Sequence, residues 1–321
     1  MAGIFRSFFL AAALMLACAA QAAGYPERPV KLVVPYGVGG GVDSISRLLA
    51  RKLGELWGQS VVVENRPGAG AIIGTQAVTS AAPDGYTLLM TAGTLAVSPS
   101  AYPNLPYDVT TDLAPITTVA ESPYVLTVNA GVPARNVREL VELARRKPGD
   151  INFGSPGKGT LSHLSFELFQ ARTGVRATIV HYKGSPAALN ALVAGQVDVV
   201  LDTPAAVVPQ IHGGRARGLA VSTARRSDSV PDIPTMMQAG VENYDVGIWF
   251  GLMAPAGTPD AVLDKIHADT LRALADPELA RRYADQGMAT HTLSRQDFAA
   301  LIRQDIGKWA DVVRQAGIRF E

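Results

Sequence analysis

Two glycine-rich segments are the parts of this sequence best suited to bind a small molecule. Residues 37–43 (GVGGGVD) and residues 155–160 (SPGKGT) each follow an apolar run and lead into a helical pattern. Glycine lets the backbone approach a ligand closely, and the free N–H groups at a helix start attract an anion. Both segments therefore predict backbone sites for a small anion. A generic tight turn is the alternative for the first, and a helix start capped at Thr160 is the simpler interpretation of the second.

Neither segment matches a nucleotide-binding motif. The dinucleotide fingerprint G-x-G-x-x-G fails because Val42 stands where the third glycine belongs. The P-loop pattern fails because Gly159 follows Lys158 in place of Ser or Thr, and Asn152 occupies the first glycine position. A carboxylate fits these donors better, since helix starts from two domains can converge on one small anion. Each start contributes roughly 0.3–1 kcal/mol to holding the charge.

The residues that could catalyse a reaction do not form a recognisable catalytic motif. The G-x-S-x-G pattern is broken because Phe153 precedes Gly154-Ser155. The only cysteine is Cys18. The histidines show no metal-binding spacing; they are His163, His181, His212, His267 and His291. We therefore expect no metal, no cofactor and no enzymatic activity.

Four polar or aromatic residues near the expected loops have competing interpretations. His163, in the first turn of a helix, is favoured as a hydrogen-bonded scaffold residue over a catalyst. Asp43 is favoured as an N-cap. Asp202 could bind a ligand or order its own loop, and both remain open. Trp249 could line a cleft, although a buried core position is favoured. A hydrolase that uses His163 with Asp43 or Asp202 is the least favoured alternative.

The order of the elements indicates the fold class. A β-rich run, a turn of small residues and a helical pattern recur along the chain, which predicts α/β layers with mostly parallel sheets. The expected strands are residues 30–36, 61–63, 86–91, 151–154, 177–182 and 197–201. The expected helices follow residues 37–42, 64–70, 155–159, 183–184 and 202–204, run from 258 to about 275, and run from 294 to 317. Ser185-Pro186 and Ser294 with Asp297 are expected to start two of them.

Two apolar stretches, residues 124–129 and 246–253, are interpreted as crossings between two domains. The first domain is then built from residues 24–124 plus 246–321, and the second from residues 125–245. A discontinuous domain with a two-strand hinge is typical of a clamshell binding protein.

Composition excludes several functional classes. Of 321 residues, 48% are apolar and 18% charged, with 29 Lys and Arg against 28 Asp and Glu. The balance argues against nucleic-acid binding driven by bulk charge, and the apolar content argues against a disordered chain.

The N-terminus carries the features of an export signal. Arg6 precedes the apolar residues 8–20, which end near a small-x-small site at residues 20–22. We expect residues 1–22 to be a signal peptide and the mature protein to be periplasmic. A membrane anchor, a buried helix, and a lipid anchor on Cys18 are the alternatives.

Motifs along the mature chain resemble those of Bug-type receptors, the extracytoplasmic binding proteins of tripartite tricarboxylate transporters. The resemblance begins at residues 25–30 (YPERPV) and continues through residues 33–36 (VVPY) and 39–43 (GGGVD). It extends in order through VVENRPGAG (62–70), PDGYTLL (83–89), LPYD (105–108), YKG (182–184), GQVD (195–198), IPT (233–235) and APAGTP (254–259).

The resemblance implies a two-domain, type II-like periplasmic binding fold that closes on a small organic carboxylate. Backbone donors and ordered water would hold the carboxyl group at Tyr36, Gly37, Val38, Gly39, Ser155, Gly157 and Thr160. The remainder of the ligand would be contacted by Thr91, Thr94, Lys183, Asp202 and Thr203, and the expected ligand-binding set also includes Asp43 and His163. Gly37-Val38 stands where the family often has Pro-Pro, which predicts a more mobile loop or an altered water pattern.

We therefore expect a monomeric solute-binding protein that captures a mono- or dicarboxylate and presents it to membrane transporter subunits. It would bind no nucleic acid. The alternative in another class is a ligand-dependent sensor partner of a membrane two-component kinase. The identity of the carboxylate does not follow from the sequence.

Overall fold

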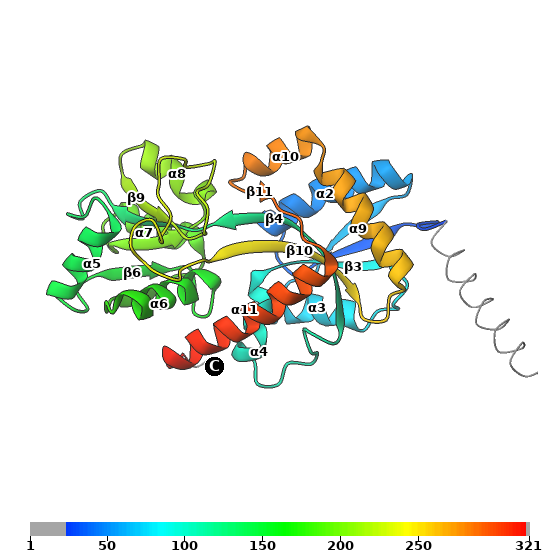
Figure 1. Ribbon diagram of the computed structural model, residues 1–321, viewed down its shortest axis with the longest axis horizontal. Helices are drawn as coiled ribbons and strands as arrows, with labels where there is room; N and C mark the ends of the chain where they lie inside the picture. Colours follow the sequence, from blue (N-terminus) through cyan, green and yellow to red (C-terminus); the bar gives the residue numbers. More distant parts are fainter. Residues whose placement is uncertain (1–23, 319–321) are drawn as a thin grey trace, which may run out of the picture.

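The computed structural model describes residues 24–318, which form two β-sheets placed along the long axis of the molecule (Figure 1). The predicted signal peptide at residues 1–22, including Cys18, lies outside the described residues. Each sheet is covered by helices, so the expected α/β layers are confirmed.

The first sheet has six strands in the order β11-β4-β10-β3-β1-β2. They are β1 (Val30–Val34), β2 (Val61–Asn65), β3 (Thr87–Ala92), β4 (Leu113–Pro123), β10 (Gly247–Pro255) and β11 (Ala289–Thr290). Strands β1, β2 and β3 are parallel neighbours, as the strand–loop–helix pattern predicts. Four of the five β1 side chains are buried, which explains the nearly continuous apolar run.

Helices pack on both faces of this sheet. They are α2 (Gly41–Trp57), η1 (Ala69–Ala71), α3 (Ile72–Thr79), η2 (Gly93–Val97), α4 (Ser98–Ala101), α9 (Asp260–Leu274), α10 (Pro277–Ala284) and α11 (Arg295–Gln315). Helix α2 buries Ile45, Leu49 and Leu53, spaced four residues apart on one face, and packs against β1, β2 and α9. Helix α11 packs against β4, α4 and η2 and also reaches the other half of the molecule (Figure 1).

The second sheet has five strands in the order β7-β6-β8-β5-β9. They are β5 (Val125–Asn129), β6 (Asn152–Ser155), β7 (Thr178–His181), β8 (Val199–Asp202) and β9 (Ala216–Val221). The helices around it are α5 (Val137–Arg146), α6 (Leu161–Thr173), α7 (Ser185–Val193) and α8 (Pro204–His212). Helices α7 and α8 pack against each other and against β5, while α6 packs against β8 and α11.

The chain passes between the sheets at two places. Strand β4 continues through Tyr124 into β5, and residues 222–246 lead from β9 back to β10. Strands β4 and β10 pair with each other and both extend toward the second sheet (Figure 1). The division into residues 24–124 plus 246–321 and residues 125–245 stays a prediction, and the strands of the two sheets fall on either side of it.

Ser222 connects the two crossings by hydrogen bonds from all of its polar groups. Its N–H donates to the Tyr124 carbonyl oxygen and its carbonyl oxygen accepts from the Val246 N–H, both at 2.9 Å. Its hydroxyl accepts from the Tyr124 N–H at 2.8 Å and donates to the Val246 carbonyl oxygen. The side chain is fully buried. The serine hydroxyl therefore links the two crossing segments where they run side by side.

Three sequence-based expectations are wrong in detail. Within residues 24–318 there are four parallel and five antiparallel strand pairings, because β10 and β11 run against the other strands of the first sheet and β5 runs against the other strands of the second. Ser185 is the first residue of α7 and Gly184 is its N-cap, since the Ser185 hydroxyl bonds to Asp202. The C-terminal part contains α10 and β11, which pairs with β4 at the sheet edge.

The start of α11 confirms its predicted cap. The Ser294 hydroxyl accepts a hydrogen bond from the Asp297 N–H at 3.1 Å, as the capping-box spacing indicates.

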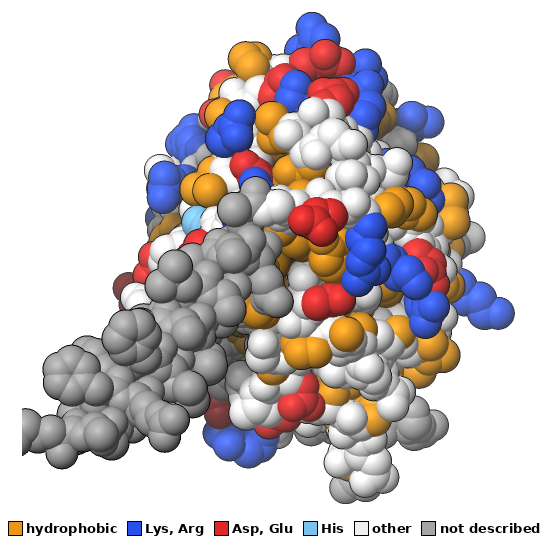
Figure 2. Space-filling view, turned by 90° about the vertical axis from the view of Figure 1, so that its right-hand side faces the viewer, with side chains coloured by type: hydrophobic (Ala, Val, Ile, Leu, Met, Phe, Trp, Pro, Cys, Tyr) orange, Lys and Arg blue, Asp and Glu red, His pale blue; other side chains and the backbone are white. Residues whose placement is uncertain are grey.

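One continuous apolar core runs through both sheets and includes, for example, Leu88 from the first and Phe153 from the second. No helix among the described residues has the length and apolar character needed to cross a membrane. Figure 2 shows the end of the molecule at the first sheet, where basic and acidic side chains are interspersed. Among the described residues, Arg28 pairs with Asp84 and Lys52 pairs with Asp276.

Candidate ligand-binding site

The first glycine-rich loop connects the end of β1 to the start of α2. Gly39 has a φ of 84°, which a residue with a side chain adopts only with strain, and no atom lies within 4 Å of where its Cβ would be. Val38 is 75% exposed, so nothing covers the loop. The loop is therefore shaped by its glycines and open to solvent.

Asp43 holds this loop in place from inside. Its carboxylate accepts hydrogen bonds from the Gly39 N–H at 2.8 Å and from Asn65 Nδ2 at 2.9 Å, and Arg47 pairs with it at 2.9 Å. Burial alone would raise the pKa of Asp43, but the hydrogen bonds from Arg47, Gly39 and Asn65 hold it below its usual value. The expected N-cap role is wrong, because Gly40 is the N-cap and Asp43 is the third helical residue. Its acceptor positions are used by the protein.

Asn65 is a supporting residue that the sequence analysis missed. It ends β2, next to β1, and its Nδ2 also donates to the Tyr36 carbonyl oxygen at 3.1 Å. Its Oδ1 accepts from Arg47 at 2.8 Å. A polar residue at the end of a strand beside a glycine-rich loop was the available signal.

The second loop, residues 155–160, connects β6 to α6. The Ser155 hydroxyl donates to the Gly157 carbonyl oxygen at 2.9 Å and accepts from the Gly157 N–H at 3.1 Å. The Thr160 hydroxyl donates to the same carbonyl at 2.8 Å and accepts from the His163 N–H, which confirms the predicted cap. Both hydroxyls are directed to the backbone of the loop, and any ligand contact would fall mainly to N–H groups.

His163 supports this second loop. Its Nδ1 accepts a hydrogen bond from the Gly159 N–H at 3.0 Å, and its ring is 3% exposed. Nε2 lies 3.6 Å from Oε1 of Glu167, and the ring of His181 lies edge-on with centroids 4.8 Å apart. These contacts are those of a hydrogen-bonded scaffold residue.

Both helix starts leave backbone donors free. The first four N–H groups of a helix have no partner within the helix. For the N–H groups of Gly41 and Val42 in α2, and of Leu161 and Ser162 in α6, the described part of the chain supplies no acceptor. Each loop therefore offers at least two first-turn amides, and α2 offers a third at Asp43, with the positive end of a helix dipole behind them.

Side-chain hydroxyls lie beside the first loop. The Tyr36 and Thr94 hydroxyls are 2.7 Å apart, which joins the end of β1 to η2. Thr91 is fully buried in β3, and its hydroxyl has no hydrogen-bond partner among the described residues. An unpaired buried hydroxyl costs free energy, so Thr91 is a candidate partner for water or ligand.

On the second sheet, Asp202 orders its own surroundings. It accepts hydrogen bonds from the Ser185 hydroxyl and, at 2.8 Å, from the Thr203 N–H. Burial raises the pKa of Asp202 above its usual value, and these two hydrogen bonds oppose the rise only in part. Lys183 is exposed and lies two residues before the start of α7. Trp249 donates to Asp305 at 2.9 Å in the core, as favoured from the sequence.

Contacts between the two halves involve the starts of α6 and α8, and the start of α2 lies beside the segment that contacts α8. A Cβ on Gly93, directly after β3, would lie 3.2 Å from Leu161 at the start of α6. A Cβ on Gly287 would lie 2.9 Å from the Ala205 N at the start of α8, and one on Gly41 would lie 2.9 Å from Met288. The starts of α2, α6 and α8 therefore meet segments of the opposite sheet or of the turn before β11.

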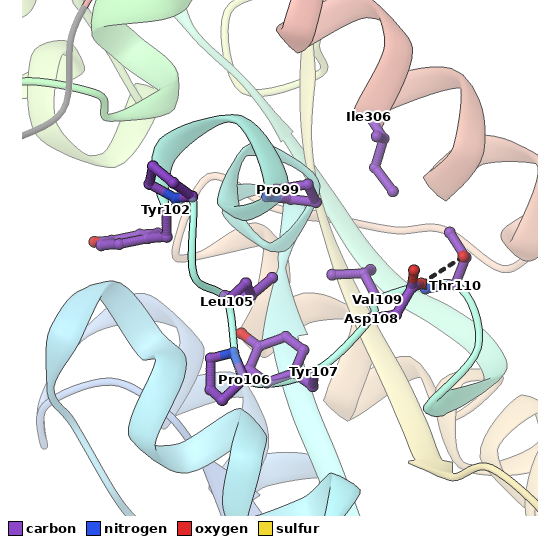
Figure 3. A pocket seen from close by; sticks show the side chains of 10 residues that line it. Pro99, Tyr102, Leu105, Pro106, Tyr107, Asp108, Val109, Thr110 and Ile306 are labelled. Carbon is purple, nitrogen blue, oxygen red and sulfur yellow. Dashed lines mark hydrogen bonds between the residues drawn. The ribbon is translucent and has the colours of Figure 1, made fainter.

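A separate hollow of about 630 Å³ lies on the first half of the molecule (Figure 3). It is lined by Pro99, Tyr102, Pro103, Leu105, Pro106, Tyr107, Asp108, Val109, Thr110 and Ile306. None of the predicted ligand-binding residues lines this hollow, so we do not include it in the candidate ligand site. No hydrogen bond among the described residues links His163 to Asp43 or Asp202, as a hydrolase would need.

The fold and these loops define a class. Two helix-covered sheets joined by two chain crossings, with open helix starts between them, are the architecture of a two-domain periplasmic solute-binding protein. Solved structures of this class superpose on the chain, among them a periplasmic transporter with a TM-score of 0.79 at 35% identity, which covers 92% of this chain and 100% of its own. The predicted fold class is confirmed.

The chain belongs to the receptors of the tripartite tricarboxylate transporter family, whose family model matches residues 45–318. The Bordetella pertussis protein BugT is 36% identical over 308 residues, which cover 95% of this chain and 94% of BugT. A structure of Rhodopseudomonas palustris MatC with bound malate has a TM-score of 0.75 at 32% identity, covering 90% of this chain and all of MatC. The resemblance to Bug-type receptors is confirmed.

Proposed function

We propose that this chain captures a small mono- or dicarboxylate in the periplasm and delivers it to the membrane subunits of a tripartite tricarboxylate-type transporter. The chain is exported by its N-terminal segment, acts as a monomer and releases its ligand unchanged. The membership of a receptor family supports this proposal, as does the malate bound to a relative.

The observation that carries the proposal is the matched pair of helix starts. One lies on each half of the molecule, and each offers at least two unpartnered first-turn amides in the described structure. A carboxylate has two oxygens that accept such bonds, and water bridges add donors at little enthalpic cost. We propose that the carboxyl group lies against Tyr36, Gly37, Val38, Gly39, Ser155, Gly157 and Thr160 and takes its hydrogen bonds mainly from the unpartnered first amides of α2 and α6. The rest of the ligand would contact Thr91, Thr94, Lys183, Asp202 and Thr203. Asp43 and His163 would contribute to binding by holding the two loops in place through the Gly39 and Gly159 N–H groups.

Isothermal titration calorimetry tests the ligand class. Purified mature protein is titrated at pH 8.0 with a panel of mono- and dicarboxylates that includes malate, with the corresponding amides or alcohols as matched neutral compounds. We expect at least one acid to bind and its neutral counterpart not to bind. Binding of the neutral compounds with equal affinity, or no heat across the panel, would contradict the proposal.

Uptake measurements separate transport from sensing. A strain that lacks this chain is given the radiolabelled acid found by calorimetry, with expression of the transporter held constant from an unrelated promoter. We expect uptake to fall to background and to return when the chain is restored. Unchanged uptake with altered transcription would identify a sensor instead.

A further inference from the structure

The two ligand loops share one construction. In α2, the third helical residue, Asp43, accepts the N–H of Gly39, which lies just before the N-cap. In α6, the third helical residue, His163, accepts the N–H of Gly159, which again lies just before the N-cap. Both glycines have positive φ, 84° and 75°. In each case a buried side chain accepts the amide before the N-cap, and the first amides of the helix have no acceptor among the described residues.

The acceptors differ in what a proton does to them. A carboxylate held below its usual pKa, as Asp43 is, remains an acceptor throughout the neutral range. An imidazole nitrogen accepts only while it carries no proton. The bond from Gly159 therefore requires neutral His163 with its proton on Nε2, the nitrogen that faces Glu167 at 3.6 Å.

The groups facing His163 come from three segments. Glu167 lies on α6 and His181 on β7, and Lys158, in the loop itself, is a charge that acts on His181. Burial lowers the pKa of His181, and the nearby His163 and Lys158 lower it further, while Glu167 opposes them. A protonated His163 would gain the Glu167 carboxylate as a partner and lose the Gly159 N–H, which would then face another donor.

We propose that neutral His163 is a positioning residue for the second ligand loop, and that its protonation releases Gly159 and weakens carboxylate binding. The effect on carboxylate affinity rests on the proposed function. The release of the Gly159 N–H on protonation of His163 concerns the free protein and does not depend on that function. The first loop, built on Asp43, keeps its form over the same pH range.

The first test measures the free protein. The Gly159 amide resonance is followed by 1H–15N NMR from pH 8.0 to 6.0 in wild type and in His163→Asn, whose Oδ1 supplies an acceptor that does not titrate. We expect the resonance to move in wild type and stay in place in the variant, with the Gly39 resonance unmoved in both. A Gly159 resonance that moves equally in both proteins, or in neither, overturns the proposal.

The second test measures affinity with malate as the probe by calorimetry over the same range. We expect wild type to bind at least about threefold more weakly at pH 6.0 than at pH 8.0, and His163→Asn to bind nearly equally at both. The carboxyl groups of malate titrate identically in both measurements, so the difference between the two proteins isolates the protein's contribution to the pH dependence of affinity. His212→Asn, at the end of α8, is the control for losing a histidine elsewhere in the molecule and is expected to retain the wild-type pH dependence.

The outcomes separate the two proposals. Equal pH profiles for wild type and His163→Asn overturn the positioning role while leaving carboxylate binding intact. If malate fails to bind at pH 8.0, the proposed ligand class is in question for that acid, and the Gly159 resonance alone decides whether His163 positions the loop.

Discussion

At the scale of single residues, the sequence predicted the positions of the two glycine-rich loops better than the residues that support them. The cap at Thr160 followed from local spacing and is confirmed. Asp43 was predicted to be an N-cap but instead holds the loop by accepting hydrogen bonds from Gly39 and Asn65. The sequence did not reveal this role, because these partners become neighbours only once β1 and β2 pair. Hydroxyl and carboxylate side chains have several competing partners, and tertiary contacts decide among them.

Gly39 provides a prediction about affinity. Gly39→Ala puts a side chain at a φ of 84°, which costs roughly 1–2 kcal/mol. The loop can relieve this strain by leaving its binding form, so we expect affinity for the bound acid to fall by up to about tenfold. Gly58→Ala, at the far end of α2 with a φ of 64°, is the matched control and should lower stability without changing affinity. Calorimetry and thermal unfolding measure both; equal affinity losses would refute the assignment.

Asp202 provides a prediction about pH. Its pKa is raised by burial, so its contribution to stability is complete below the pKa of the unfolded chain and is lost as pH rises through the raised value. Asp202→Asn keeps partners for Ser185 and Thr203 but carries no charge. Urea unfolding at pH 4 and pH 7 should show the variant gaining stability relative to wild type at the higher pH. If the difference in unfolding free energy between the two proteins is the same at pH 4 and pH 7, the pKa of Asp202 is not raised by burial.

At the scale of elements, hydrophobic patterning identified the strands and helices whose signal is local. Helix α2 was predictable from its apolar residues at four-residue spacing. Strand β11 was not, because it consists of Ala289 and Thr290 and exists only through pairing with the edge of β4. The antiparallel strands beside the crossings were missed for a similar reason: direction within a sheet depends on where the chain returns.

Ser222 provides a prediction at this scale. Ser222→Ala leaves the Tyr124 N–H with no side-chain acceptor at a fully buried position, which should cost about 1–3 kcal/mol of unfolding free energy. Ser46→Ala is the matched control, because that buried hydroxyl donates only to the Val42 carbonyl of its own helix. Urea denaturation should show a smaller loss for Ser46→Ala. Equal losses in the two variants would mean that the hydrogen bonds of Ser222 between the crossings make no special contribution to the unfolding free energy.

At the scale of the whole molecule, two sheets share one core yet are joined by only two crossings of the chain. The sequence indicated this organisation through apolar runs at residues 124–129 and 246–253, which are among the strands that border the crossings. It did not indicate how α11, at the end of the chain, packs against α6 of the other half. Such a contact depends on the assembled shape and leaves no local pattern.

Closure of the two halves on a ligand is the prediction that belongs to the whole molecule. Cys18, within the predicted signal peptide, is the only cysteine, so protein produced from residue 23 onward accepts engineered thiols without competition. Spin labels at Arg51→Cys on α2 and Arg146→Cys on α5 report the separation of the halves, and labels at Arg146→Cys and Arg225→Cys, both within the predicted second domain, form the matched control.

Ligand can favour a closed form only by binding it more tightly than the open form. Since the free amides of α2 and α6 lie on opposite halves, one carboxylate that contacts both must bind the closed form better. We expect pulsed electron paramagnetic resonance to show the first distance shortening by several ångströms on adding the bound acid, and the control distance staying constant. Binding detected by calorimetry with no change in the first distance would place the ligand on one half alone.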